Sequence, residues 1–128
     1  MPVSASFHVD CLTRSAAESR AWLRTVLAVA LPAGVRYDLI DDAVLCASEL
    51  ISNAVEAGCA SATLSMCVAD GVMRLSVIDD AQGHPLMSEP LATAARGRGL
   101  VLVDALSSRW GVDPAAVGKE VWAELALI

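Results

Sequence analysis

Residues 48–55 read Ser48-Glu49-Leu50-Ile51-Ser52-Asn53-Ala54-Val55 and lie inside an apolar run that predicts a helix from about Tyr37 to Ala57. Glu49 and Asn53 are four positions apart, so a helix of about 3.6 residues per turn places both on one face. Their neighbours are apolar, and we expect a buried helix with Leu45, Cys46, Leu50, Ile51, Ala54 and Val55 around the pair. A buried carboxylate and amide are costly unless something binds them, so the pair is a candidate site; the alternative is a polar stripe facing water.

Upstream, the pattern predicts a strand and then a first helix. Residues 4–12 alternate in part, with Phe7, Val9 and Cys11 on one side and Ser6, His8 and Asp10 on the other. The sequence Ser15-Ala16-Ala17-Glu18 is a capping box, which predicts a helix from there to about Val29. The expected buried stripe of this helix is Ala17, Ala21, Trp22, Val26, Leu27 and Ala30.

Downstream, Gly58 is expected to end the second helix, because glycine accepts the left-handed conformation of a helix cap. Two alternating runs follow, residues 62–68 and 72–79, joined by Asp70-Gly71, which is a strong signal for a tight hairpin. Period two places Asp79 on the same inward face as the apolar residues of its strand. An inward carboxylate at a strand end needs a partner.

The last third of the chain predicts a loop, a helix and a second hairpin. Residues 81–96 lack a clear period, and we expect a mobile loop that can include a helical turn. Gly97-Arg98-Gly99 then opens a helix whose buried positions are either Leu100, Val103 and Leu106 or Val101, Leu102 and Ala105. Trp110-Gly111-Val112 predicts a strand, Asp113-Pro114 a turn, and residues 121–127 the final strand.

This order of elements predicts an α+β fold in one domain spanning residues 1–128. Strands that follow one another without crossover helices pair antiparallel, and the helices then cover one face of the sheet. The expected architecture is a two-layer α/β sandwich. Glu49, Asn53, Asp79 and the glycines that flank the loop would line a cavity between its layers.

Composition excludes several classes of function. Nine Lys plus Arg against fifteen Asp plus Glu give a net charge of −6, which disfavours a nucleic-acid surface. We expect no membrane interaction and a cytoplasmic location, because no apolar stretch approaches the ~20 residues of a membrane span and no secretory signal is visible. The cysteines show no paired spacing, so all four are expected to be reduced, buried, small residues: Cys11, Cys46, Cys59 and Cys67.

Three motifs in one order resemble the N, G1 and G2 boxes of the gyrase/histidine-kinase (GHKL) ATPase superfamily, and they are residues 49–55, 77–83 and 97–103. The sequence is most similar to the small bacterial branch that contains the anti-sigma-factor serine kinases and related ATP-binding regulators of actinobacteria. Residues 109–112 and 118–125 are also typical of that branch. The resemblance covers about residues 15–127 and implies a Bergerat-type sandwich that binds ATP and Mg²⁺.

The resemblance also implies a role for each site residue. Asp79 would accept a hydrogen bond from the adenine amino group, Asn53 would ligate Mg²⁺, and Glu49 would orient or deprotonate the attacking hydroxyl. Gly97 and Gly99 would supply amides to the phosphates. The remaining nucleotide-binding residues carried over from the boxes and the lid are Gly83, Arg96, Arg98 and Leu100.

The chain departs from the family pattern at three positions. Ala57 stands where a histidine is usual, Ala81 where the first glycine of the G1 box is usual, and Glu120 where relatives often carry threonine. A carboxylate at Glu120 would repel phosphates if it faced the pocket. These departures leave ATP turnover open while nucleotide binding stays the expectation.

Two functions therefore remain open at the level of sequence. The first is an ATP-binding regulator of transcription that binds a protein partner, such as a sigma factor, and phosphorylates a serine on an anti-sigma-factor antagonist. The alternative is a degenerate interaction module that has lost nucleotide turnover. A homodimer is expected from the family, and a histidine-kinase catalytic domain is disfavoured because no phosphoacceptor helix precedes the domain.

Overall fold

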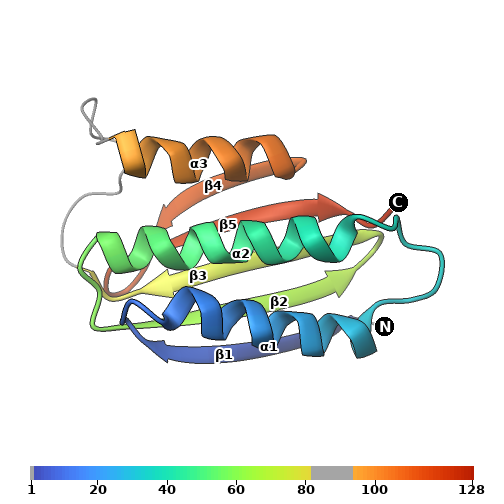
Figure 1. The fold of residues 1–128 in the computed structure, drawn as a ribbon, viewed down its shortest axis with the longest axis horizontal. Coiled ribbons are helices and arrows are strands. Elements are labelled where there is room, and N and C mark those ends of the chain that lie inside the picture. Colours follow the sequence, from blue (N-terminus) through green and yellow to red (C-terminus); the bar gives the residue numbers. More distant parts are fainter. Residues whose placement is uncertain (1, 82–93) are drawn as a thin grey trace.

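A computed structural model describes the backbone of residues 2–81 and 94–128 and the side chains of all of these except residues 94–99. The chain forms an α+β sandwich, as the sequence predicts (Figure 1). In order, its elements are β1 (Val3–Asp10), α1 (Ser15–Ala30), α2 (Leu39–Glu56), β2 (Ser61–Ala69), β3 (Val72–Asp79), α3 (Ala94–Leu106), β4 (Arg109–Pro114) and β5 (Lys119–Ala126).

The five strands form one antiparallel sheet in the order β1-β2-β3-β5-β4. β3 therefore lies in the middle, between β2 and β5, and β4 forms an edge. Asp79 at the end of β3 is opposite Ala62 on one side and Lys119 on the other. The sheet thus brings the start of its last strand beside the carboxylate that the sequence places inward.

The three helices cover one face of the sheet, with α2 between α1 and α3 (Figure 1). Helix α2 is buried around most of its circumference because α1 and α3 lie on either side of it and the sheet lies beneath it. Its fully covered residues are Leu39, Ala43, Val44, Cys46, Ala47, Ser48, Leu50, Ile51, Asn53 and Ala54. The predicted burial is confirmed except at Leu45, which is exposed, and Val55, which is half-buried.

The predicted turn chemistry is confirmed at two places. Asp70 and Gly71 both have positive φ, 53° and 79°, as a tight primed hairpin turn requires. Gly58 follows α2 with a φ of 88°, which is the left-handed conformation expected of a helix cap.

The capping box predicted for α1 is wrong. The N-cap residue is Arg14, and no side chain caps the helix. The Ser15 hydroxyl instead accepts from the Leu12 amide at 3.0 Å and donates to the Asp10 carbonyl at 2.9 Å, and it therefore fastens the turn after β1. Glu18 pairs with Arg14 at 3.4 Å.

The buried face of α1 differs from the prediction in part. Leu27 is buried and Trp22, Val26 and Ala30 pack against the core as predicted, whereas Ala17 and Ala21 are exposed. Ser15, Ser19 and Leu23 are buried as well. Phe7 of β1 stacks on Trp22 of α1, with ring centroids 5.3 Å apart.

Helix α3 begins at Ala94, earlier than the predicted start at Gly97. Alanine has the highest helix propensity, so the small-residue run before the glycines extends the helix backward. Val103 is fully buried, Leu100 and Leu106 are half-buried, and Val101 and Leu102 are exposed, which confirms the first of the two predicted faces.

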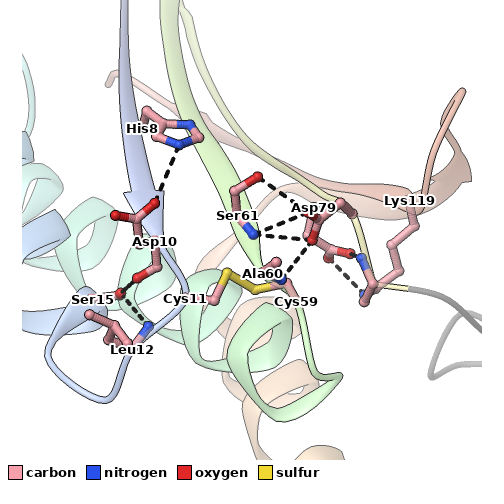
Figure 2. The surroundings of a disulfide bond; sticks show 12 residues. His8, Asp10, Cys11, Leu12, Ser15, Cys59, Ala60, Ser61, Asp79 and Lys119 are labelled. Atoms are coloured by element: carbon pink, nitrogen blue, oxygen red, sulfur yellow. Dashed lines mark hydrogen bonds and ion pairs between the residues drawn. A yellow bond between two sulfur atoms is a disulfide. The ribbon is translucent and has the colours of Figure 1, made fainter.

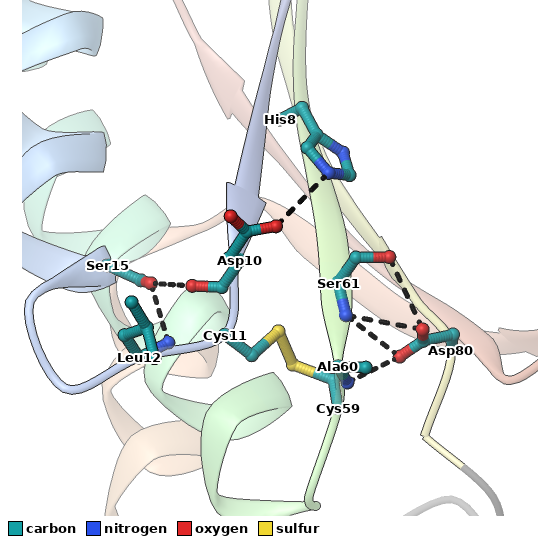
Figure 3. A network of polar contacts seen from close by, with 9 residues as sticks. All are labelled: His8, Asp10, Cys11, Leu12, Ser15, Cys59, Ala60, Ser61 and Asp80. Carbon is teal, nitrogen blue, oxygen red and sulfur yellow. Dashed lines mark hydrogen bonds and ion pairs between the residues drawn. A yellow bond between two sulfur atoms is a disulfide. The ribbon is translucent and has the colours of Figure 1, made fainter.

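The expectation that all four cysteines are reduced is wrong. Cys11 and Cys59 form a disulfide with a Cα–Cα distance of 5.7 Å, and Cys46 and Cys67 are free. The bond joins the segment after β1 to the turn between α2 and β2 (Figure 3). A backbone hydrogen bond from the Cys11 amide to the Ala60 carbonyl, 3.0 Å, reinforces the same junction.

Candidate functional site

Four chain segments meet at one end of the sandwich, the left end in Figure 1. They are the C-terminal end of α2, the end of β3, the beginning of β5 and the N-terminal end of α3. The predicted site residues other than Gly83 are distributed over these segments. The fold therefore brings the helix pair and the strand carboxylate to the same end of the molecule.

The α2 pair has the geometry that the sequence predicts. Asn53 is only 5% exposed, and its side chain has no hydrogen-bonding partner among the residues that the structure describes. Glu49, one turn earlier, is half-buried and makes no hydrogen bond or ion pair within the same ranges. Among the described residues, Ser19 Oγ is the one fully buried side-chain polar atom without a hydrogen-bonding partner, so the Asn53 amide is not a buried unsatisfied group. Asn53 is a candidate ligand because of its chemistry, an amide oxygen one helical turn from a carboxylate.

The free Cys46 thiol lies near Glu49 on α2 and has a raised pKa. Burial raises the pKa of the free Cys46 thiol to about 12, and the negative charges of Glu49 and Asp42 add to that rise. The Cys46 thiol is therefore neutral at physiological pH, and it behaves as an apolar core residue rather than a nucleophile.

Asp79 points inward, as period two predicts, and both of its carboxylate oxygens are engaged. Oδ1 accepts from the backbone N–H of Ala81 at 2.9 Å, and Oδ2 accepts from Lys119 Nζ at 2.8 Å. Figure 2 shows the two side chains reaching toward each other from neighbouring strands. The partner that an inward carboxylate requires is thus Lys119, a residue to which the sequence analysis assigns no role.

The following residue, Asp80, anchors this end of the sheet. Its carboxylate accepts from the backbone amides of Ala60 at 2.8 Å and Ser61 at 3.1 Å, and from the Ser61 hydroxyl at 3.3 Å (Figure 3). The amides of Ser61 and Ala60 hold the pKa of Asp80 below its ordinary value. Because Ala60 follows Cys59, the network and the disulfide together fix the backbone around Asp79.

Gly118 is in close contact with the main chain of Asp79. Its φ is 77°, and an added Cβ would overlap the Asp79 carbonyl and lie 3.0 Å from the Asp80 Cα. Only glycine fits this position, because both the conformation and the space exclude a side chain.

Gly118→Ala is therefore expected to lower the free energy of unfolding by about 3 kcal/mol, from left-handed strain plus the overlap. Gly58→Ala is the matched control, since Gly58 has the same kind of φ, 88°, and nothing within 4 Å of the added Cβ. Its expected cost is about 1 kcal/mol. Urea unfolding of both variants measures the difference, and equal costs would show that the contact with Asp79 is unimportant.

Strand alternation settles which way Glu120 points. Lys119 and Val121 are buried on the helix-covered face, so Glu120 between them faces the other side of the sheet, opposite Ile78 and Asp113. The repulsion of phosphates considered from sequence therefore does not arise at this position. The same alternation, counted back from Val121, could have identified Lys119 as inward-facing.

The other predicted residues lie toward α3. Gly83 lies outside the described residues. Gly97 falls in the first turn of α3, where backbone N–H groups lack helical partners, and Gly99 falls beyond that turn. Arg96 and Arg98 belong to the same helix, and Leu100 is half-buried.

Comparisons with known proteins agree with this architecture. Residues 12–125 match the family described as the histidine kinase-like ATPase domain. No curated protein matches the chain. No helix in the described ranges has the length and apolar character needed to cross a membrane.

A similar solved structure is that of the RsbU and RsbW domains of Rv1364c from Mycobacterium tuberculosis, with a TM-score of 0.69 and 28% sequence identity. The similarity covers 96% of the present chain and 32% of the mycobacterial chain, so this protein corresponds to about one third of that structure. Because the family match extends over most of the sequence, from just after β1 into β5, the chain belongs to the histidine kinase-like ATPase domain family.

Proposed function

We propose that this protein is an ATP-binding regulator that binds a protein partner and transfers phosphate from ATP to a serine of an anti-sigma-factor antagonist. The observation that carries the proposal is the placement of Asn53, only 5% exposed, one helical turn from Glu49 on the same face of α2. Both lie at the end of the sandwich where Asp79 is buried. An amide oxygen and a carboxylate are the donor types suited to Mg²⁺ and to a hydroxyl proton, respectively.

Each residue has a distinct part in the proposed reaction. Asp79 accepts from the adenine amino group, and the first turn of α3, which includes Gly97, donates backbone amides to phosphate oxygens. Asn53 would hold Mg²⁺, which supplies charge neutralisation at the phosphates. Glu49 takes the proton of the attacking serine hydroxyl as its oxygen bonds to the γ-phosphorus and the bond to the ADP oxygen breaks.

The partner assignment rests on similarity. It is supported by the structurally similar chain, which carries an RsbW domain, and by the resemblance of the sequence to the anti-sigma-factor kinases. A sigma factor, its antagonist and a second copy of the chain are the proposed partners. A cytoplasmic location stays a prediction. The sequence supports it in part through the expectation of reduced cysteines, and the Cys11–Cys59 bond removes that support because disulfides are rare in reducing compartments.

A second candidate function, a protein-interaction module without turnover, is favoured by one contact. Lys119 donates to Asp79 Oδ2 at 2.8 Å, and Asp79 is the residue proposed to accept from the adenine amino group. If this ion pair closes the base site, the sandwich would act through protein contacts alone.

Thermal unfolding with Mg-ATP separates the two functions. A ligand at 100 times its dissociation constant adds about 2.7 kcal/mol of stability, so the melting temperature of the wild type is expected to rise by several degrees. Asn53→Ala should lose this shift. Glu49→Gln should keep it and yet fail to move labelled phosphate to a serine of the antagonist.

The outcomes are separable because Glu49 and Asn53 have different roles. A wild-type melting temperature that does not respond to saturating Mg-ATP would leave only the interaction module. Equal phosphate transfer by the wild type and Glu49→Gln would remove Glu49 as the base while leaving ATP binding intact.

A further inference from the structure

The Asp79–Lys119 pair is unusual in its depth. The two side chains are 1% and 7% exposed, and Nζ lies 2.8 Å from Oδ2. A buried ion pair is a weak source of stability, because desolvation of both charges offsets their attraction, and apolar residues of the same volume often serve as well. The pair therefore calls for an explanation other than stability.

The protein holds both groups firmly in place. Asp79 and Lys119 are register partners on β3 and β5, and the Ala81 amide fixes the other carboxylate oxygen. Gly118, next to Lys119, packs against the Asp79 main chain without room for a side chain. The acceptor Oδ2 and the donor Nζ therefore lie directly beside each other, 2.8 Å apart.

Both atoms have hydrogen-bonding capacity left. An ammonium group has three N–H donors and a carboxylate oxygen has two lone pairs. In the described part of the chain, Nζ and Oδ2 each make one hydrogen bond, to the other. Within the described residues, Nζ therefore has two N–H donors and Oδ2 one lone pair to spare, next to each other, although the two side chains are only 7% and 1% exposed.

We propose that Lys119 is a second base-reading residue, which donates to the ring nitrogen N1 of adenine while Asp79 accepts from the neighbouring amino group. This inference rests on the proposed ATP binding and adds the residue that completes base selection. The exocyclic amino group and N1 of adenine are an adjacent donor and acceptor. Asp79 supplies an acceptor for the amino group, and Lys119 supplies a donor for N1.

The same arrangement rejects guanine. Guanine has a carbonyl oxygen where adenine has the amino group, and an N–H where adenine has the N1 acceptor. In the same pose its oxygen would face the Asp79 carboxylate and its N–H would face the Lys119 ammonium, so both contacts become repulsive. Repulsion of the wrong ligand, added to attraction of the right one, increases the difference between the two affinities and therefore the specificity.

The test removes the acceptor from the ligand rather than the donor from the protein. We expect wild-type protein to bind 1-deaza-ATP, which keeps the amino group but lacks N1, at least about 10-fold more weakly than ATP, since the lost hydrogen bond involves a charged donor. The control 7-deaza-ATP, altered on the opposite edge of the base, should bind within about twofold of ATP. Calorimetry with Mg²⁺ measures all three affinities.

A variant then assigns the effect to Lys119. Lys119→Met is expected to bind ATP and 1-deaza-ATP equally, and to discriminate less between ATP and GTP than the wild type. Should this variant fail to fold, the wild type with ¹⁵N-labelled lysine gives the same answer: the Lys119 ammonium resonance shifts with ATP and stays in place with 1-deaza-ATP.

The possible failures are distinguishable. Wild-type protein that binds none of the nucleotides contradicts the proposed function itself. ATP binding with equal affinity for 1-deaza-ATP leaves the proposed function standing and overturns the role of Lys119. Unequal affinities that persist in folded Lys119→Met, or a Lys119 resonance that does not respond to ATP, overturn it as well.

Discussion

Lys119→Met is expected to lower the free energy of unfolding by about 3–5 kcal/mol, because it leaves the Asp79 carboxylate buried without its counter-charge. The side chains of this ion pair are almost fully covered, 7% and 1% exposed. Asp79→Asn should lower the free energy of unfolding by a similar amount, because it leaves the Lys119 ammonium buried without its counter-charge. The double variant should be more stable than the sum of the two effects predicts, by about 2 kcal/mol or more, since neither charge remains.

Urea unfolding of the four proteins measures this coupling. The matched control is Arg24→Met, which breaks the exposed Arg24–Asp41 pair of 3.0 Å, with side chains 54% and 76% exposed. Its expected cost is under about 1 kcal/mol. Additive effects of Lys119→Met and Asp79→Asn, or a cost no larger than that of the control, would contradict the assignment of a buried ion pair.

Reduction of the Cys11–Cys59 disulfide is expected to lower the free energy of unfolding by about 4 kcal/mol. The estimate follows from the sequence separation of 48 residues between the two cysteines and from the entropy that cross-linking removes from the unfolded chain. The bond also ties the turn before β2 to the segment after β1, where Asp80 fixes the same turn through Ala60 and Ser61.

Unfolding with and without dithiothreitol measures this effect. The variant in which both Cys11 and Cys59 are replaced by serine should be as unstable as the reduced wild type and should not respond to reductant. Cys67→Ser, at a free and half-buried cysteine, should keep the full response. A wild type whose stability is unaffected by dithiothreitol would show that the bond does not form or does not contribute.

Local chemistry explains why much of the fold could be predicted. The Asp70-Gly71 turn, the cap at Gly58 and the alternation that turns Asp79 inward all depend on residues near one another in sequence. The i, i+4 spacing of Glu49 and Asn53 is of the same kind. Where the next few residues determine a conformation, the pattern and the structure agree.

The differences arise where distant segments decide. Ser15 could have capped α1, but Asp10 and Leu12 compete for its hydroxyl once β1 is in place. The pairing of Cys11 with Cys59 depends on β1 lying beside β2, which no cysteine spacing reveals. The contact between Lys119 and Asp79 likewise requires the strand order that places β5 next to β3.

The central claim is that the ends of α2 and β3 and the starts of β5 and α3 form one adenine-nucleotide site. The most direct test is a titration of ¹⁵N-labelled protein with Mg-ATP, followed through the amide resonances. We predict saturable shifts at the backbone amides of Asp79, Ala81 and Lys119 and at the side-chain amide of Asn53. Spectra that do not change at saturating Mg-ATP, or that change only at residues far from this end of the sandwich, would contradict it.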